Sequence, residues 1–364
     1  MGGARNIFTL PGPMRMYRGG ACLSRVDVAY ETWGELNDAR DNAILLFTGL
    51  SPSAHAAASQ LDPSPGWWEE MIGKDHPIDT RRYFLICVNS LGSCFGSTGP
   101  ASINPDTGEP YRLDFPVLSL EDVARSAKEL LRGLGIEKLS AVMGASMGGM
   151  TALAFAVKFP AMAESVVSIS AAARALPFAI ALRSLQREII RSDPAWNGGD
   201  YPLGAGPIRG MQLARKLGMI TYRSSKEWQM RFGRERVAEE RKTGDAFAID
   251  FEVESYMEAH ARKFTGQFDP NCYLYLSRAM DLFDLGDHGG SVAAALARVK
   301  ARRALVIGVE TDFLFPLFQQ QEIATDLEAA GVDVTFAGLD SLQGHDAFLV
   351  DMDNFRPLIG EFLS

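Results

Sequence analysis

An apolar run changes into a helical pattern within residues 140–160, SAVMGASMGGMTALAFAVKFP, at the five residues Gly144-Ala145-Ser146-Met147-Gly148. Residues 139–143 have the length and composition of a buried strand, and residues 151–159 place apolar side chains at helical spacing up to a proline. The small residues around the serine allow a tight turn between strand and helix. Such a turn exposes the hydroxyl of Ser146 beyond the end of the strand, at a helix N-terminus. The pattern therefore predicts a nucleophilic serine.

The partners of this serine are predicted from the C-terminal part of the chain. The G-x-S-x-G pattern also arises by chance, so it needs support from a base and from a group that orients the base. Asp312 follows the apolar run at residues 304–309, and His345 lies shortly after the last apolar run. The order serine, aspartate, histidine is that of α/β-hydrolases. We therefore expect Ser146, Asp312 and His345 to form a catalytic triad, in preference to a turn-capping aspartate and a surface histidine.

An attacking serine creates a negatively charged oxygen that backbone N–H groups must stabilise. One donor is expected to be the N–H of the residue after the nucleophile, Met147. The other is expected in the loop that follows the first buried strand, at Leu50. These two residues are the predicted oxyanion hole.

Short apolar runs alternate with helical patterns along much of the chain. The predicted strands span residues 26–33, 43–48, 84–89, 139–143, 166–170, 304–309 and 332–337, and predicted helices span residues 120–134 and 317–330. This alternation predicts an α/β-hydrolase fold, with a mostly parallel sheet that carries helices on both faces. Ligands of such sheets bind at the carboxyl ends of the strands, where residues 50, 146 and 312 fall.

The strand pattern disappears between residues 171 and 300. Helical patterns over residues 178–191, 208–219, 251–263 and 273–282 replace it. Because strands resume afterwards, we expect residues 171–300 to form a helical lid, inserted into a core made of residues 1–170 and 301–364. The lid should form the roof of the active site. Residues 1–20 show no clear periodicity, and we expect them to form a surface arm.

Composition and charge exclude several classes of function. The chain has 364 residues, of which 47% are hydrophobic and 22% charged, and its formal net charge is -9. The acidic balance and the lack of a lysine or arginine block argue against nucleic-acid binding. The longest apolar runs have the length of strands, and residues 1–15 lack the apolar centre of a signal peptide. We expect no membrane association and a cytoplasmic location, and an anionic substrate would need a locally basic pocket.

The sequence gives little support for metal or disulfide chemistry. The four cysteines, at positions 22, 87, 94 and 272, have neither the spacing of a metal site nor the density of a disulfide scaffold. The five histidines form no H-x-x-x-H pair. We therefore expect free thiols, no metal and no tightly bound cofactor.

Several further motifs are spread along the chain. They are NSLGSC at 89–94, GSTGPASINP at 96–105, LDFP at 113–116, GASMGGM at 144–150, DPAWNGG at 193–199 and GHDAFL at 344–349. Together these motifs resemble the homoserine O-acetyltransferase family of the α/β-hydrolase superfamily, over nearly the whole chain after about residue 20. Within that family, residues 47–55 and 175–187 are most similar to the serine or homoserine O-succinyltransferase branch.

The resemblance implies that an acyl group passes from coenzyme A to the hydroxyl of L-serine or L-homoserine, in cysteine or methionine biosynthesis. It implies a ping-pong mechanism through an acyl-serine intermediate, and a homodimer formed through the lid helices. By their matching positions, Arg215 and Tyr222 would hold the carboxylate of the amino acid, and Asp346 would face its ammonium group. An arginine grips a carboxylate through two hydrogen bonds, and an aspartate suits an ammonium. The alternatives are a solvated Arg215 and a helix-capping Asp346.

The acyl donor is expected to be succinyl-CoA. Succinyl carries a carboxylate that acetyl lacks, and its pocket should supply a cation, since an unpaired buried charge is costly. Arg183 is the candidate, with Arg187 on the same helix face, and Arg174 is a second possibility. The alternative for Arg183 is a surface arginine that pairs with Glu188 or Asp193.

Three other functions remain open. The first is the same transfer with acetyl-CoA as donor. The second is an esterase or lipase-like hydrolase, because a triad does not by itself distinguish water from an alcohol as acceptor. The third is a pseudoenzyme that serves as a binding scaffold, against which the intact triad argues. Serine and homoserine differ by one methylene, which is worth only about 1 to 3 kcal/mol in an apolar pocket, so the acceptor also stays open.

Overall fold

The computed structural model describes residues 4–202, 204–241 and 244–364. It is organised around an eight-stranded sheet with the strand order β1-β4-β8-β5-β9-β10-β11-β12. The strands are β1 (Asn6–Thr9), β4 (Asp27–Trp33), β5 (Ala43–Phe47), β8 (Phe84–Val88), β9 (Leu139–Ala145), β10 (Ala163–Ile169), β11 (Arg303–Val309) and β12 (Asp333–Leu339). Neighbouring strands from β8 to β12 in this order are parallel, whereas β4 runs antiparallel to both of its neighbours, β1 and β8. The expected α/β-hydrolase fold with a mostly parallel sheet is confirmed.

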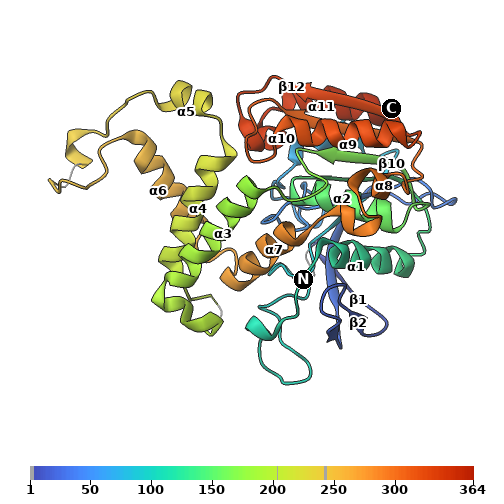
Figure 1. The fold of residues 1–364 in the computed structure, drawn as a ribbon, viewed down its shortest axis with the longest axis horizontal. Helices are drawn as coiled ribbons and strands as arrows, with labels where there is room; N and C mark the ends of the chain where they lie inside the picture. The colour runs from blue at the N-terminus through green and yellow to red at the C-terminus, as the bar shows by residue number, and fades with distance from the viewer. Residues whose placement is uncertain (1–3, 203, 242–243) are drawn as a thin grey trace.

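Helices and loops cover both faces of the sheet (Figure 1). On one face, α1 (Leu120–Gly133), α2 (Met147–Lys158) and α9 (Leu317–Ala329) pack against strand residues such as Leu45 and Val142. On the other face, α10 (Ala347–Val350), α11 (Met352–Leu363) and part of residues 56–78 pack against Leu46 and Met143. Adjacent strand residues therefore belong to opposite cores, because side chains alternate along a strand. A strand buried on both faces explains why residues 43–47 are all apolar.

Residues 4–20 correct one expectation, and residues 1–3 of the expected arm lie outside the described residues. Residues 4–20 are not a surface arm, because β1 adds an antiparallel strand to the edge of the sheet, with Asn6 opposite Tyr30 and Thr9 opposite Asp27. The following residues form a small ribbon in which β2 (Met14–Arg15) pairs with β3 (Cys22–Leu23). Met14 and Met16 are buried in the main core. A second small pair joins β6 (Ile72–Gly73) and β7 (Ile78–Asp79).

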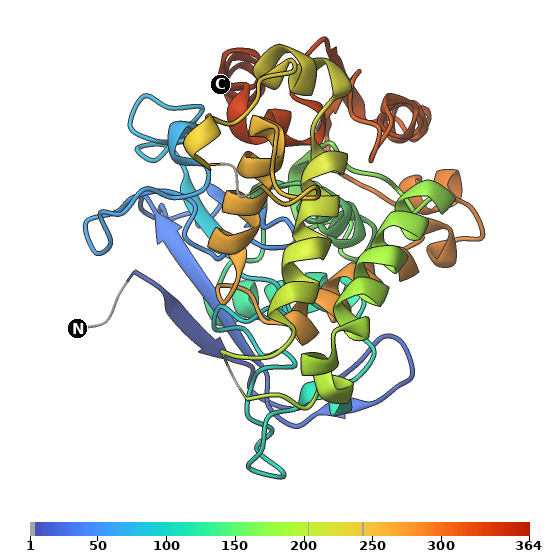
Figure 2. The same cartoon turned by 90° about the vertical axis from the view of Figure 1, so that its left-hand side faces the viewer.

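A series of helices lies between β10 and β11. They are α3 (Pro177–Ser192), α4 (Ile208–Tyr222), α5 (Ser225–Phe232), α6 (Glu252–Phe264), α7 (Pro270–Leu282) and α8 (Val292–Leu296). Helix α4 packs between α3 and α6, and α3 also contacts α7. Figure 2 shows α3, α4 and α6 side by side in front of the rest of the molecule. No helix formed by the described residues combines the length and apolarity needed to cross a bilayer.

Candidate active site

Ser146 occupies the sharp turn between β9 and α2. Its backbone angles are φ 56° and ψ -125°, a region that residues with side chains rarely adopt. Two glycines make the turn possible. A Cβ atom at Gly144 would lie 2.3 Å from the backbone of Gly148, and one at Gly148 would lie 2.3 Å from the carbonyl oxygen of Phe47. The expected sequence of strand, tight turn and helix is therefore present, and it presents the serine hydroxyl at the end of the sheet.

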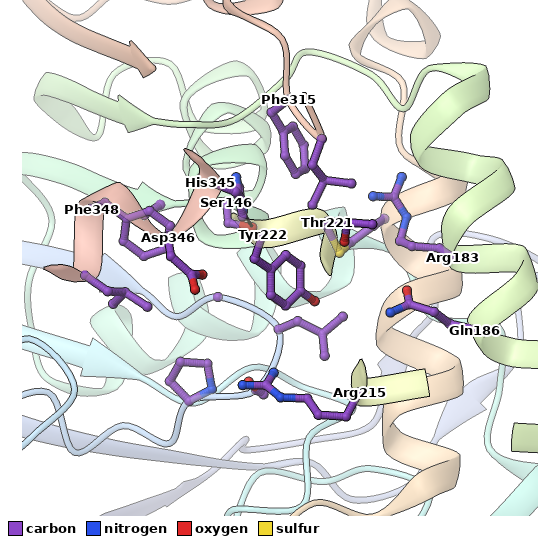
Figure 3. A pocket seen from close by; sticks show the side chains of 18 of the residues that line it. Ser146, Arg183, Gln186, Arg215, Thr221, Tyr222, Phe315, His345, Asp346 and Phe348 are labelled. Atoms are coloured by element: carbon purple, nitrogen blue, oxygen red, sulfur yellow. Dashed lines mark hydrogen bonds between the residues drawn. The ribbon is translucent and has the colours of Figure 1, made fainter. Parts of the chain in front are cut away.

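The structure brings Ser146, His345 and Asp312 into one hydrogen-bonded chain. Figure 3 shows Ser146 and His345 next to each other. His345 Nε2 lies 2.8 Å from Ser146 Oγ, and His345 Nδ1 lies 2.7 Å from Asp312 Oδ2. The other carboxylate oxygen of Asp312 accepts the backbone N–H groups of Leu314 and Phe315, at 2.9 and 2.8 Å. The carboxylate is thereby fixed as acceptor of the Nδ1–H, which leaves Nε2 free to take the serine proton.

The environment of His345 favours its protonation. Burial by itself lowers the pKa of this imidazole, but the charge and hydrogen bond of Asp312 outweigh burial and raise the pKa above 6.5. The ring of Phe315 stacks on the imidazole with centroids 4.9 Å apart, and Phe348 contacts its edge. The base is therefore both oriented and able to hold a proton temporarily.

The two expected oxyanion donors lie at the ends of adjacent parallel strands. Met147 is the first residue of α2, where backbone N–H groups lack helical partners, and Leu50 follows β5 at the edge of the cavity above Ser146. Among the described residues, no backbone hydrogen bond engages either N–H group. Both donors are thus available beside the serine.

A cavity above Ser146 collects most of the expected site residues (Figure 3). Loops from the sheet form its floor, and α3, α4 and α7 form its roof. The expected residues that line it are Leu50, Ser146, Arg183, Arg215, Tyr222, His345 and Asp346. Met147 and Asp312 lie directly behind this lining, in the protein interior.

Arg215 and Asp346 face the same cavity with different partners. The guanidinium of Arg215 lies over the rings of Phe264 and Tyr222, 4.6 and 5.9 Å from their centroids. Its Nε is buried and has no hydrogen-bond partner among the described residues. Asp346 Oδ2 accepts a hydrogen bond of 3.1 Å from Arg223 Nε, yet burial raises the pKa of Asp346. A positive group next to Asp346, in addition to Arg223, would favour the ionised form of its carboxyl group.

Arg183 is not a surface residue, and it pairs with neither Glu188 nor Asp193. It is 5% exposed, and its Nε donates to Asp281 Oδ1 at 2.6 Å. The other oxygen of Asp281 pairs with Arg187 Nη2 at 2.6 Å. One carboxylate therefore faces two guanidinium groups, which leaves a net positive charge. Arg183 Nη2 is buried without a hydrogen-bond partner within the described part of the chain.

Arg174, the second possible cation, lies outside this cavity. Both of its terminal nitrogens donate to Glu322, at 3.0 and 2.9 Å. The two side chains are about one third exposed. Arg174 is thus already paired near the protein surface.

Two polar residues of the site were missed by the sequence analysis. Gln186 follows Arg183 by one helical turn and lines the cavity, with its Nε2 donating to the carbonyl oxygen of Ala214 at 3.0 Å. Its spacing of three from Arg183 is the signal that could have found it. Arg223 holds Asp346 across 123 positions in sequence, and no local pattern could have predicted that contact.

His55, in the loop that also carries Leu50, is expected from its position after the first buried strand to line the entrance, but it lies outside the lining of the cavity above Ser146. Its Nδ1 lies 2.9 Å from Glu31 Oε2, and its Nε2 lies 2.8 Å from the carbonyl oxygen of Ser64. A carboxylate and a carbonyl oxygen both accept hydrogen bonds, so the two partners favour the protonated ring. Burial lowers the pKa of His55, but Glu31, Ser64 and Asp62 together raise it above its usual value. The contact with Glu31 ties this loop to β4.

The thiols and carboxylates of the described residues add no candidate site for a metal ion. All four cysteines are free. In the described ranges, no group of three or more histidine, cysteine, aspartate or glutamate side chains is arranged to hold a metal ion.

Known proteins resemble the whole chain. The family model described as alpha/beta hydrolase fold matches residues 42–350. A protein of Litchfieldella anticariensis named serine O-succinyltransferase is 62% identical over 362 residues, which cover 99% of this chain and 98% of the relative. A protein of Stenotrophomonas maltophilia with the same name is 59% identical, and the match covers 97% and 96% of the two chains.

Solved structures agree with this similarity. The homoserine O-acetyltransferase from Bacillus anthracis superimposes with a TM-score of 0.90 at 30% identity, covering 99% of this chain and 97% of the other. Esterase E22 superimposes with a TM-score of 0.89 at 32% identity, covering 99% of each chain. The same fold and a similar sequence therefore occur in proteins named as transferases and as esterases.

Proposed function

We propose, on the premise that this chain belongs to the homoserine O-acetyltransferase family of the α/β-hydrolase fold, that it transfers a succinyl group from succinyl-CoA to the hydroxyl of L-serine. One observation carries the proposal. The cavity above Ser146 contains two guanidinium groups, of Arg183 and Arg215, that each keep a buried nitrogen without a partner among the described residues. The proposed reaction brings two carboxylates into this cavity, one on the succinyl group and one on the amino acid. An esterase acting on neutral esters needs neither cation.

The first half of the reaction transfers the acyl group to the enzyme. Ser146 Oγ attacks the thioester carbonyl carbon, and His345 Nε2 takes the serine proton. The N–H groups of Leu50 and Met147 stabilise the resulting oxyanion. As the tetrahedral intermediate collapses, the carbon–sulfur bond breaks and the thiolate of CoA takes the proton from His345. Succinyl-Ser146 remains.

The second half transfers the acyl group to the amino acid. Arg215 and Tyr222 hold the carboxylate of L-serine, and Asp346 pairs with its ammonium group. His345 takes the proton of the substrate hydroxyl, whose oxygen attacks the acyl-serine carbonyl. The ester bond to Ser146 breaks, and His345 returns the proton to Ser146 Oγ. The product ester is activated for later replacement of its oxygen by sulfur, which fits a role in cysteine biosynthesis.

Arg183 binds the distal carboxylate of the succinyl group. Its Nη2 is available, and the single carboxylate of Asp281 does not neutralise both Arg183 and Arg187. Burying a succinyl carboxylate beside this pair therefore adds the missing negative charge. Acetyl-CoA lacks this group, so the same pocket favours succinyl-CoA.

The lid and the assembly are also proposals. Residues 171–300 form a lid over a core of residues 1–170 and 301–364, because the roof of the cavity comes from α3, α4 and α7. Exposed apolar side chains at Leu185, Leu213 and Ile220 of α3 and α4 support a homodimer formed through these helices. Because acyl-CoA and a free amino acid are its substrates, we propose a cytoplasmic location.

A thiol-release assay that crosses two donors with two acceptors tests the function. We expect succinyl-CoA with L-serine to release CoA fastest, and little release without an amino acid. Faster release with acetyl-CoA would overturn the choice of donor, and faster release with L-homoserine would overturn the choice of acceptor. Release that needs no amino acid would identify a hydrolase. Full activity of Ser146→Ala would exclude the acyl-serine mechanism.

A further inference from the structure

A second cavity adjoins the cavity above Ser146. Its lining includes Arg215, Tyr222, Phe264 and Asp346, which also line the first cavity. We call it the outer cavity. The residues that line it but not the first cavity include Arg223, Trp228, Tyr256, His260 and Lys263, which lie on or beside α4, α5 and α6. The shared residues make the two cavities immediate neighbours.

The outer cavity is basic, although the chain as a whole carries a net charge of -9. Arg215, Arg223, Lys263 and His260 line it, and Asp346 is the acidic side chain in its lining. Arg223 pairs with Asp346 at 3.1 Å and with Glu227 at 3.5 Å, whereas no ion pair engages Lys263 among the residues that the structure describes. The cavity therefore keeps unbalanced positive charge next to the catalytic centre.

Aromatic rings form another part of its wall. The rings of Tyr256 and His260 lie 3.9 Å apart, and Trp228 contacts Tyr256 edge to face at 6.1 Å. His260 Nδ1 donates to the carbonyl oxygen of Tyr256 at 2.9 Å, so its Nε2 is left for another partner. Flat aromatic faces beside cationic side chains are what a purine nucleotide requires.

We propose that the outer cavity binds the nucleotide end of acyl-CoA. Lys263, Arg223 and His260 contact its phosphates, and the adenine stacks on Trp228. Tyr256 only borders this site, because the ring of His260 and the guanidinium of Arg231 already lie 3.9 and 4.3 Å from its centroid. The pantetheine arm then passes Phe264 and Tyr222 to bring the thioester to Ser146. This inference rests on the proposed function, because it assigns a site to the donor of that reaction.

The charge distribution around the first cavity favours this direction of approach. Another part of its rim consists of Ser51, Pro52 and Trp67, none of which is charged. Beyond that rim, the ring of His55 is already held by Glu31 at 2.9 Å. A polyanionic nucleotide therefore gains more electrostatic stabilisation on the α4–α6 side than at this rim.

The experiment compares two donors in the variant Lys263→Glu. One donor is succinyl-CoA, and the other is S-succinyl-N-acetylcysteamine, a truncated thioester without nucleotide or phosphates. Reversing the charge of an exposed lysine should leave the fold intact. We expect the KM for succinyl-CoA to rise about tenfold with little change in kcat. The KM for the truncated donor should stay unchanged.

Lys226→Glu is the matched control. Lys226 is an exposed lysine of α5 that does not line the outer cavity, and its substitution makes the same change in net charge. Its KM for succinyl-CoA should stay near that of the wild type. A second variant, Trp228→Ala, should also raise the KM for succinyl-CoA alone, through loss of stacking.

The inference fails if Lys263→Glu leaves the KM for succinyl-CoA unchanged, if both donors respond equally, or if Lys226→Glu has the same effect. Failure of the proposed function is a separate result. It would appear as absence of serine-dependent CoA release from succinyl-CoA by the wild-type protein in the same assay.

Discussion

In the proposed mechanism, Ser146 reacts by giving its hydroxyl proton to His345. This transfer requires that Nε2 of the imidazole faces the hydroxyl without a proton of its own. Asp312 provides this orientation, because two backbone N–H groups hold one of its oxygens while the other accepts His345 Nδ1–H. The same carboxylate raises the pKa of His345 against the effect of burial. One buried group thus sets both the tautomer and the basicity of the imidazole.

This coupling predicts the pH dependence of acyl transfer. Only the neutral imidazole accepts a proton, so kcat/KM should increase with pH, with a midpoint above 6.5 because the pKa of His345 is raised. Asp312→Asn removes the charge that raises this pKa. Its midpoint should move to lower pH, while kcat falls by a factor on the order of 10⁴ through loss of the correct tautomer. The pH profile of CoA release measures both effects, and an unchanged midpoint would contradict the role of Asp312.

In the proposed reaction, helix α3 carries the side chains that distinguish one acyl donor from another. Arg183 and Gln186 are one turn apart and reach the cavity from the same face (Figure 3). Helix α7 contributes Asp281, which holds Arg183 and Arg187 in place through its two oxygens. The ion pair with Asp281 fixes the orientation of the Arg183 guanidinium, so that Nη2 stays available for a ligand.

Arg183→Met should therefore change the choice of donor. The variant removes the cation that meets the succinyl carboxylate, and Arg187 still pairs with Asp281. We expect kcat/KM for succinyl-CoA to fall by about 10- to 100-fold relative to that for acetyl-CoA. The ratio of the two values is the measurement, because partial unfolding lowers both equally. Arg191→Met on the same helix, where Arg191 is exposed, is the control and should keep the wild-type ratio.

The molecule as a whole combines a rigid sheet with a roof of helices whose outer surface is partly apolar. Leu213 and Ile220 lie seven residues apart on α4 and are 42% and 46% exposed. Side chains at this spacing share one face of a helix. An apolar face on the outside of the molecule is the basis of the proposed homodimer.

Leu213→Glu should weaken that dimer. A charge buried at the contact between two copies would lack a partner, which is costly. Sedimentation should give twice the chain mass for the wild type and a shift toward the single chain for the variant. Leu61→Glu is the control, since Leu61 is 70% exposed and lies outside α3–α7. A wild-type protein that sediments as a monomer would contradict the proposal.

The sequence by itself determined the parallel part of the sheet, the turn at Ser146 and the order of Ser146, Asp312 and His345 along the chain. Strands such as β5 and β9 are visible because they are buried on both faces and therefore consist of apolar runs. The turn is visible because its backbone contacts exclude any side chain at Gly144 and Gly148. Local pattern is sufficient wherever burial or backbone geometry limits the choice of residue.

The tertiary structure alone decided the partners of the charged groups and the place of the N-terminal residues. β1 lies at the sheet edge with mostly exposed side chains, so it leaves no apolar run in the sequence. Arg183 meets Asp281 across 98 positions, and Arg223 meets Asp346 across 123. A charged side chain does not reveal its partner by periodicity, because ion pairs form between whatever elements the fold brings together. The outer cavity is of this kind, since its basic lining comes from α4, the residue that follows α4, and α6, in a chain that is acidic as a whole.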